Sequence, residues 1–152
     1  MRRKEREITD HERILEIIAG CDVCRLGMID ERGAYIVPMN FGFSDSDGLK
    51  LYFHSAAEGK KLDILRKNSC VTFEMDSKHR LQAGEVACKY TFFYECVMGR
   101  GRIRFLEGGE KRAGLDLIMA HYGEARPEYD PRGLERVAVL ELSVDEISAK
   151  AH

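Results

Sequence analysis

The chain has 152 residues, of which 44% are apolar, and this length and composition predict a single domain, residues 1–152, with one hydrophobic core. Its 24 basic and 26 acidic residues give a formal charge of −2, which argues against nucleic-acid and membrane-surface partners. No apolar run approaches the roughly 20 residues of a membrane span and no signal-peptide segment follows the start, so we expect a cytoplasmic protein.

The first half of the chain is predicted to contain one helix and three strands. Thr9 and Glu12 have the spacing of a capping box, and apolar residues at helical spacing then continue to about Ala19. Alternating apolar side chains, separated by turns at 30–33 and 44–48, indicate extended segments. These strands are expected from residue 24, at 35–43 and at 49–55.

The second half is predicted to hold longer strands and two more helices. In chain order we expect a helix at 60–67, a strand at 70–75, a polar loop at 76–84, a strand at 90–106, a helix at 115–122 ended by Gly123, an irregular segment to residue 134, and a strand at 137–148. About six strands joined as successive hairpins, with three helices, predict a mainly β fold, an antiparallel β-barrel.

Gly99 and Gly101 interrupt the strand predicted at 90–106. They do not form a dinucleotide-binding fingerprint, because the third glycine and the strand–turn–helix context are missing. Bulges that curve a barrel strand explain these glycines better.

Two adjacent lysines open the helix predicted at 60–67, after a strand and a loop of small residues. Cationic side chains are unfavourable at a helix N-terminus, because the helix macrodipole is already positive there. A bound phosphate would remove the conflict, since free helix amides and ammonium groups bind phosphate together. The sequence therefore predicts a phosphate site made by Ser55, Lys60 and Lys61. The alternative is that both lysines are ordinary exposed helix residues.

Pro38 lies inside a strong strand pattern, although proline cannot donate a hydrogen bond to a sheet. One interpretation is a plain edge strand. The other is an irregular backbone that leaves amide and carbonyl groups near Met39, Asn40 and Phe41 free for a polar ligand. On the next strand, His54 is expected on the face opposite Leu51, where a lone histidine is usually structural or solvated.

Cys21 and Cys24 suggest a metal or redox site, but no second ligand pair follows at zinc-finger spacing and the βαβ setting of a thioredoxin-like site is missing. Cys88 and His79 complete such a site only by assumption, so no metal is predicted. The odd number of cysteines does not indicate a disulfide framework. Two others fall in apolar strands and are expected to be small core residues: Cys70 and Cys96.

Several short motifs in this chain resemble the flavin-binding split-barrel superfamily that includes the pyridoxamine 5′-phosphate oxidases, and most closely its nitroimidazole-resistance (Nim-like) proteins. In chain order the matching segments are Arg-Glu-Ile8, Val37-Pro-Met-Asn-Phe-Gly42, Tyr52-Phe-His-Ser-Ala56, Gly59-Lys-Lys-Leu-Asp63, and Tyr94-Glu-Cys-Val97 followed by Gly99 and Gly101. Two features depart from the family: Cys96 stands where serine is common, and the arginine-rich C-terminal segment of the pyridoxamine oxidases is missing. Vitamin B6 oxidation is therefore not the expected activity.

The resemblance implies a six-stranded antiparallel split barrel that forms a homodimer with one FMN at each of two interface sites. It implies that backbone around Asn40 receives the polar edge of the isoalloxazine ring, and that Lys61 is the more important of the two lysines. Tyr94 and Glu95 would meet the flavin of the partner subunit, or alternatively form an ordinary strand pair. The full set of expected cofactor-binding residues is Val37, Pro38, Met39, Asn40, Phe41, His54, Ser55, Lys60, Lys61, Tyr94 and Glu95.

The function that the resemblance implies is an FMN-dependent oxidoreductase, since in such proteins the flavin performs the electron chemistry. Electrons would pass from a reduced donor, such as NADH or NADPH, to a small organic acceptor, with a nitroaromatic compound as the family-suggested acceptor. His54 is expected beside the flavin, as a proton donor. The alternatives are a non-catalytic flavin- or haem-binding split barrel and a structural metal module built on the cysteines.

Overall fold

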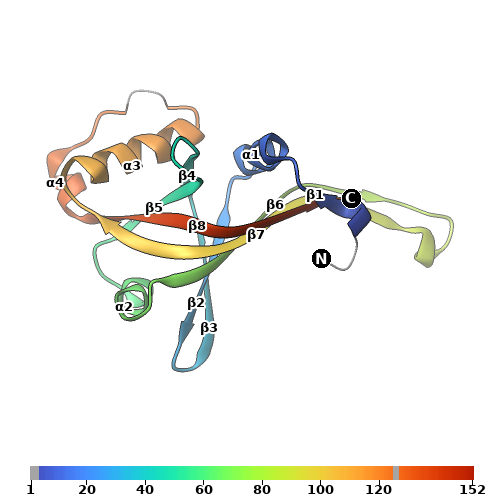
Figure 1. Cartoon of the computed structure of the whole chain (residues 1–152), viewed down its shortest axis with the longest axis horizontal. Coiled ribbons are helices and arrows are strands. Elements are labelled where there is room, and N and C mark those ends of the chain that lie inside the picture. Colours follow the sequence, from blue (N-terminus) through green and yellow to red (C-terminus); the bar gives the residue numbers. More distant parts are fainter. Residues whose placement is uncertain (1–3, 125–126) are drawn as a thin grey trace.

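One antiparallel sheet of eight strands dominates the computed structural model, which describes residues 4–124 and 127–152. Its strands are β1 (Glu7–Ile8), β2 (Cys24–Asp30), β3 (Gly33–Met39), β4 (Phe41–Ser44), β5 (Lys50–Ala56), β6 (Cys70–Gln82), β7 (Thr91–Leu106) and β8 (Val137–Ala151). The helices are α1 (His11–Ala19), α2 (Lys60–Lys67), α3 (Gly108–His121) and α4 (Pro131–Glu135). The predicted mainly β, antiparallel architecture is confirmed (Figure 1).

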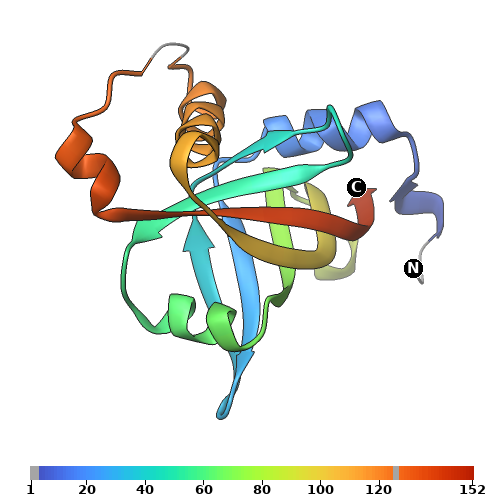
Figure 2. The ribbon, with the colours of Figure 1, turned by 60° about the vertical axis from the view of Figure 1, so that its left-hand side comes forward.

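The two ends of the sheet meet at Asn40. The strand order is β3-β2-β6-β7-β8-β5-β4, so β3 and β4 are the end strands although only Asn40 separates them in the sequence. The sheet therefore curls round on itself without closing, as a split barrel does (Figure 2). The single strand expected at 35–43 is wrong, because its first part pairs with β2 and its second part with β5.

Strands β6 and β7 extend beyond the body of the protein as a two-stranded arm (Figure 1). The loop expected at 76–84 is wrong, since β6 continues to Gln82 and pairs with β7 as far as Thr91. A register irregularity between Ser77 and Arg80, with Lys78 at a φ of 54°, interrupts this pairing. The segment is polar because the outer part of the arm is exposed rather than packed on a core.

The hydrophobic core has two parts. The larger lies within the curled sheet, closed by α1 and α2, and includes Ile17, Leu26, Phe41, Phe53, Leu62, Met75, Val97 and Leu140. The smaller lies under α3, on the other side of β5 and β8, and is formed by Tyr52, Leu106, Leu115, Ile118 and Val139. Contacts of α3 with β4 and β5 fix the helix over the Asn40 end of the sheet.

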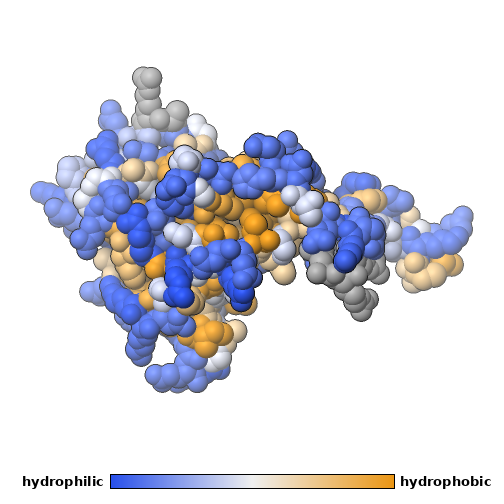
Figure 3. Space-filling model, in the orientation of Figure 1, coloured by the Kyte–Doolittle hydropathy of each residue, from blue (hydrophilic) through white to orange (hydrophobic). Residues whose placement is uncertain are grey.

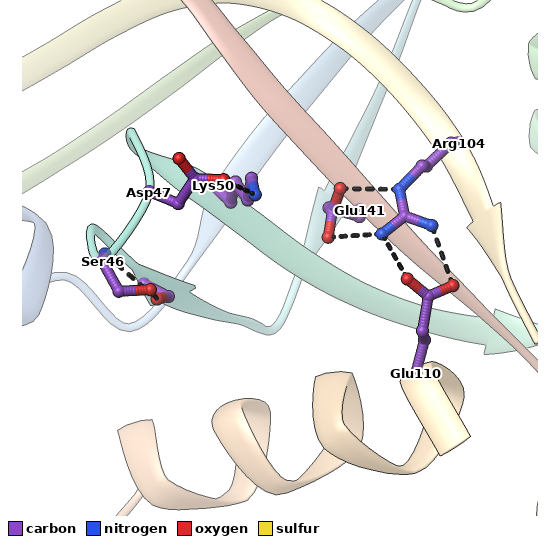
Figure 4. Close-up of polar contacts among 7 residues, drawn as sticks. Ser46, Asp47, Lys50, Arg104, Glu110 and Glu141 are labelled. Carbon is purple, nitrogen blue, oxygen red and sulfur yellow. Dashed lines mark hydrogen bonds and ion pairs between the residues drawn. The ribbon is translucent and has the colours of Figure 1, made fainter. Parts of the chain in front are cut away.

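The N-terminal end of α3 is joined to the sheet by Arg104. Its guanidinium donates to the nearly buried carboxylate of Glu141 at 2.7 and 3.0 Å, and to the exposed carboxylate of Glu110 at 2.9 Å twice (Figure 4). Bidentate pairs of this kind fix the geometry as well as the charge. The network ties β7, β8 and α3 together.

Three local expectations need correction. The N-cap of α1 is Asp10 rather than Thr9, because the Asp10 carboxylate accepts the Arg13 amide at 3.0 Å. The segment expected to be irregular contains α4, which Asp130 caps and which has proline in its first turn. Cys70 is exposed, whereas Cys96 is buried as expected.

The glycines of β7 stand where β8 approaches very closely. The register of β7 against β8 shifts between Arg100 and Gly101, which confirms a bulge at this point. A Cβ atom on Gly101 would lie 1.9 Å from the backbone oxygen of Ser143. Since backbone cannot move aside as a flexible side chain can, we expect Gly101→Ala to lower the free energy of unfolding by about 3 kcal/mol in chemical denaturation.

Gly109→Ala is the matched control for this prediction. Gly109 lies in α3, and an added Cβ atom would meet nothing within 4 Å. The substitution should therefore stabilise the protein slightly, because alanine restricts the unfolded chain more than glycine does. Equal stabilities of the two variants would contradict the close approach of β8.

Candidate functional site

The start of α2 brings a cationic side chain close to the Asn40 break. The helix begins after Gly59, whose φ is 132°, and no side chain caps it. Its first amide groups are therefore free for water or a ligand. A helix N-terminus with free amides is a ready anion site.

Lys61 is half-buried and has no carboxylate partner among the described residues. Its Nζ atom lies 3.9 Å from the Met39 sulfur, at the end of β3. Burial lowers the pKa of Lys61, because desolvation penalises the charged ammonium. An ammonium group that is partly desolvated and unpaired fits a bound anion, and the contact with Met39 connects the α2 start to the Asn40 break.

Lys60 points to a different place. Its Nζ atom lies 2.6 Å from the Asp30 carboxylate and 4.4 Å from the centre of the Tyr35 ring, on the β2–β3 hairpin. The Lys60 ammonium in turn lowers the pKa of Asp30. The structure therefore separates the two adjacent lysines: Lys60 is held in a local ion pair, and Lys61 is free to bind a ligand.

His54 and Ser55 occupy opposite faces of β5. Ser55 is buried and its hydroxyl donates to the backbone oxygen of Ala56 at 3.0 Å. His54 faces outward, opposite Leu51 as expected. Although the His54 ring is open to solvent, desolvation by its surroundings lowers its pKa, and the charge of Lys61 lowers it further. His54 therefore lies within electrostatic reach of Lys61.

The backbone at the Asn40 break holds the remaining residues of this region. Pro38 pairs with Arg25 of β2 and sits on an end strand of the sheet, as proline requires. Val37, on the same strand, pairs with Leu26. The amide of Phe41 is not free, because it donates to the Tyr122 hydroxyl at 3.2 Å. Asn40 is exposed and lies outside both strands.

Tyr94 and Glu95 are not brought to this region within one chain. They lie on β7 near the base of the arm, and Figure 1 shows the arm and α2 at opposite ends of the molecule. The Glu95 carboxylate pairs with Arg13 and, at 3.1 Å, with Lys78. Lys150 lies over the Tyr94 ring at 5.4 Å. A second chain would be needed to join the two halves of the expected site.

The cysteines show no metal-binding arrangement in the part of the chain that the structure describes. No three side chains of histidine, cysteine, aspartate or glutamate there come together as ligands for a metal ion. All five cysteines are free thiols. Cys21 and Cys24 are buried, and burial raises the pKa of both. Both side chains belong to the larger core.

Three residues around the site were not found from the sequence: Asp30, Tyr35 and Tyr122. The Lys60 ammonium pairs with Asp30 and lies over the Tyr35 ring, so these two residues orient the Lys60 side chain. The Tyr122 hydroxyl accepts a hydrogen bond from the Phe41 amide. The sequence pattern indicated Asp30 only as a turn residue, and Tyr122 only as an apolar position of its helix.

None of the helices within residues 4–124 and 127–152 has the length and apolar character needed to cross a membrane.

Comparison with known proteins identifies a matching family model and a solved structure with more than 30% sequence identity. The family model described as pyridoxamine 5′-phosphate oxidase (Pyridox_ox_2) matches residues 10–151. The crystal structure of a candidate 5-nitroimidazole antibiotic resistance protein from Bacteroides thetaiotaomicron is 36% identical, with a TM-score of 0.83 over 95% of this chain and 86% of that chain. No curated protein matches the sequence.

More distant solved structures share the fold. An FAD- and haem-binding protein from Mycobacterium smegmatis superposes with a TM-score of 0.81 at 16% identity, covering 95% of this chain and 72% of that one. A flavocytochrome from Azotobacter vinelandii superposes with a TM-score of 0.78 at 18% identity, covering 100% of this chain and 72% of that one. At these identities, the likeness concerns the fold alone.

Proposed function

This chain belongs to the pyridoxamine 5′-phosphate oxidase family, and on that premise we propose that it binds FMN and acts as an FMN-dependent oxidoreductase. The observation that carries the proposal is Lys61, a half-buried ammonium group without a carboxylate partner among the described residues, at the uncapped start of α2. A phosphate dianion suits both the charge and the free helix amides. Bound FMN would supply two-electron transfer from a reduced nicotinamide to a small organic acceptor.

The residues around Lys61 have separate tasks in this proposal. Lys61 and the first amides of α2 would hold the phosphate, and backbone at Asn40 would receive the polar edge of the ring. His54 would donate a proton to the reduced product. Burial lowers the pKa of His54, and the charge of Lys61 lowers it further. A phosphate that neutralises Lys61 would remove the second of these causes and so raise the protonated fraction of His54.

The proposed acceptor is a nitroaromatic compound. The basis is the solved structure of the candidate 5-nitroimidazole resistance protein, which is 36% identical over 95% of this chain. His54 is exposed and would lie beside the proposed flavin site, where a small planar substrate would be able to approach it.

We also propose that the active form is a homodimer. A single chain exposes more surface than a compact monomer does, and it does not bring all the expected site residues together. The chain exposes 9618 Å², whereas a compact monomer of 17.3 kDa exposes about 7,800 Å². The excess of about 1,800 Å² is in the range that each protomer of an obligate dimer buries. Large exposed hydrophobic residues concentrate on the arm, namely Leu81, Val86, Tyr90 and Phe92.

The surface also carries hydrophobic side chains in the middle of the face seen in Figure 1, surrounded by hydrophilic ones (Figure 3). Such patches are a mark of protein–protein contact. In a dimer, Tyr94 and Glu95 at the base of the arm could reach the partner's Asn40 region, which they do not reach within their own chain. NADH or NADPH and the acceptor would then enter between the subunits.

Absorbance and light scattering of the purified protein test the proposal. We expect a flavin spectrum, bleached without oxygen by NADH or NADPH and restored by a nitroaromatic compound, and a particle of twice the chain mass. A flavin spectrum that neither nucleotide bleaches would favour a flavin carrier. A haem spectrum, or a protein that takes up no FMN, would contradict the proposed function. A monomer with bound FMN would contradict the shared site.

A further inference from the structure

The C-terminal end of α3 joins the two sides of the Asn40 break through one hydroxyl group. The Tyr122 hydroxyl accepts the Phe41 amide at 3.2 Å and donates to the backbone oxygen of Asp22 at 2.7 Å. Phe41 is the first residue of β4, and Asp22 lies in the loop that leads into β2, the partner of β3. The hydroxyl therefore bridges the backbone on either side of Asn40.

The helix end that carries Tyr122 is itself held in place. Gly123 has a φ of 93°, and the amides of Gly123 and Glu124 donate to the oxygens of Ala120 and Met119 at 3.1 and 3.0 Å, which is the Schellman pattern of a helix C-terminus. His121 lies 2.8 Å from the backbone oxygen of Cys21, and its ring packs 4.4 Å from that of Phe41.

Close packing of α3 on β4 adds to this rigidity. A Cβ atom on Gly42 would lie 2.4 Å from the backbone oxygen of Leu117, so only glycine allows the two backbones to come this close. The position of α3 relative to β4 is therefore fixed by a close approach of the two backbones.

We propose that Tyr122 is a positioning residue for the isoalloxazine ring, which rests on the function proposed above. The Phe41 amide already donates its hydrogen bond to the Tyr122 hydroxyl. The backbone of Asn40 therefore remains as the group that can receive the polar edge of the ring. Met39 is already paired with Cys24, so Asn40 alone lies between the two strands. Tyr122 is 42% exposed, and the two backbone contacts of its hydroxyl link the end of α3 to β4 and to the loop before β2.

The variant Tyr122→Phe removes the hydroxyl and keeps the ring. We expect it to weaken the binding of FMN and of riboflavin by the same factor, about five- to tenfold, because the hydrogen bonds of the hydroxyl to the Phe41 amide and to the Asp22 oxygen are both lost. The ratio of the two affinities should stay unchanged, because riboflavin lacks only the phosphate. In the protein without flavin, the Phe41 amide should exchange its hydrogen faster, and in the flavin-bound variant the visible absorption band should shift.

Tyr129→Phe is the matched control. Tyr129 is partly buried and packs against the smaller core under α3. Its variant should keep both flavin affinities, even where its thermal stability falls. A general loosening of α3 would instead affect both variants alike.

Three results would overturn the positioning role. Unchanged riboflavin affinity in Tyr122→Phe would show that the hydroxyl does not prepare the ring site. A loss confined to FMN would assign Tyr122 to the phosphate. Wild-type protein that binds neither flavin would remove the proposed function itself and the role of Tyr122 with it, whereas the first two results would leave the proposed function standing.

Discussion

Lys61→Ala is expected to weaken FMN binding about 100-fold and to leave riboflavin binding unchanged. A hydrogen bond to a charged group contributes about 1.5–3 kcal/mol, and 1.4 kcal/mol corresponds to a factor of ten in affinity. We expect the contribution of Lys61 to FMN binding to lie near the upper end of this range, because its half-buried ammonium has no competing carboxylate among residues 4–124 and 127–152. Titration of the flavin-free protein with each ligand, followed by flavin fluorescence, measures both affinities.

Lys60→Ala provides the control, since it removes the same charge from the adjacent position. The Lys60 ammonium already pairs with Asp30 at 2.6 Å and contacts the Tyr35 ring. Its loss should change FMN affinity by no more than about threefold, because an exposed charge acts weakly through water. If the two variants lost FMN equally, or if Lys60→Ala lost more, the assignment of the phosphate to Lys61 would be wrong.

The pH dependence of FMN binding follows from the same burial. Burial lowers the pKa of Lys61, so its ammonium loses the proton at a lower pH than an ordinary lysine, whose pKa is about 10.4. Phosphate binds the charged form, so FMN affinity should fall as the pH rises through this lowered pKa. Binding at alkaline pH should take up a proton. Riboflavin affinity should not share this fall, and if it did, Lys61 would not be the cause.

Short-range sequence patterns were enough to predict the part of the site built on one continuous segment. The α2 helix has the predicted bounds, because Leu62 and Leu65 are buried at helical spacing and Asn68 ends it. His54 faces outward because side chains alternate along β5. Both features depend only on residues a few positions apart.

The remaining features depend on partners far away in the sequence. Apolar alternation continues unchanged through Asn40, so the pattern does not reveal that the chain leaves one end of the sheet and joins the other. Lys60 and Lys61 look equivalent until Asp30 is placed beside one of them. The Tyr122 hydroxyl meets an amide 81 positions earlier, a contact that helical periodicity cannot report.

The polar composition of residues 76–82 was misleading for a related reason. A strand is recognised by its buried face, and the outer part of the arm has none within its own chain. In the proposed homodimer, a second chain would cover its exposed hydrophobic residues, such as Leu81 and Phe92. The same proposal would account for the separation of Tyr94 and Glu95 from Lys61 within one chain.

Arg104→Met is expected to lower the free energy of unfolding by about 2–3 kcal/mol. The Glu141 side chain is only 7% exposed, and without Arg104 its carboxylate would remain buried without a cationic partner (Figure 4). Removing one partner of a fully buried ion pair costs about 3–5 kcal/mol. The expectation is smaller because the Arg104 side chain is 48% exposed, so water can enter beside Glu141 once the guanidinium is gone.

A double-mutant cycle separates this cost from the value of the ion pair itself. Arg104→Met combined with Glu141→Leu should recover at least half of the lost stability in urea denaturation, because the uncompensated charge is then absent. Glu110→Gln should have little effect, since that carboxylate is exposed and water replaces the contact. A double variant less stable than Arg104→Met alone would show that the Glu141 side chain stabilises the junction of α3 with the sheet even without Arg104, and would contradict the expected cost of its buried charge. In that case the flavin affinity should fall together with stability, because the same helix carries Tyr122 to the Asn40 break.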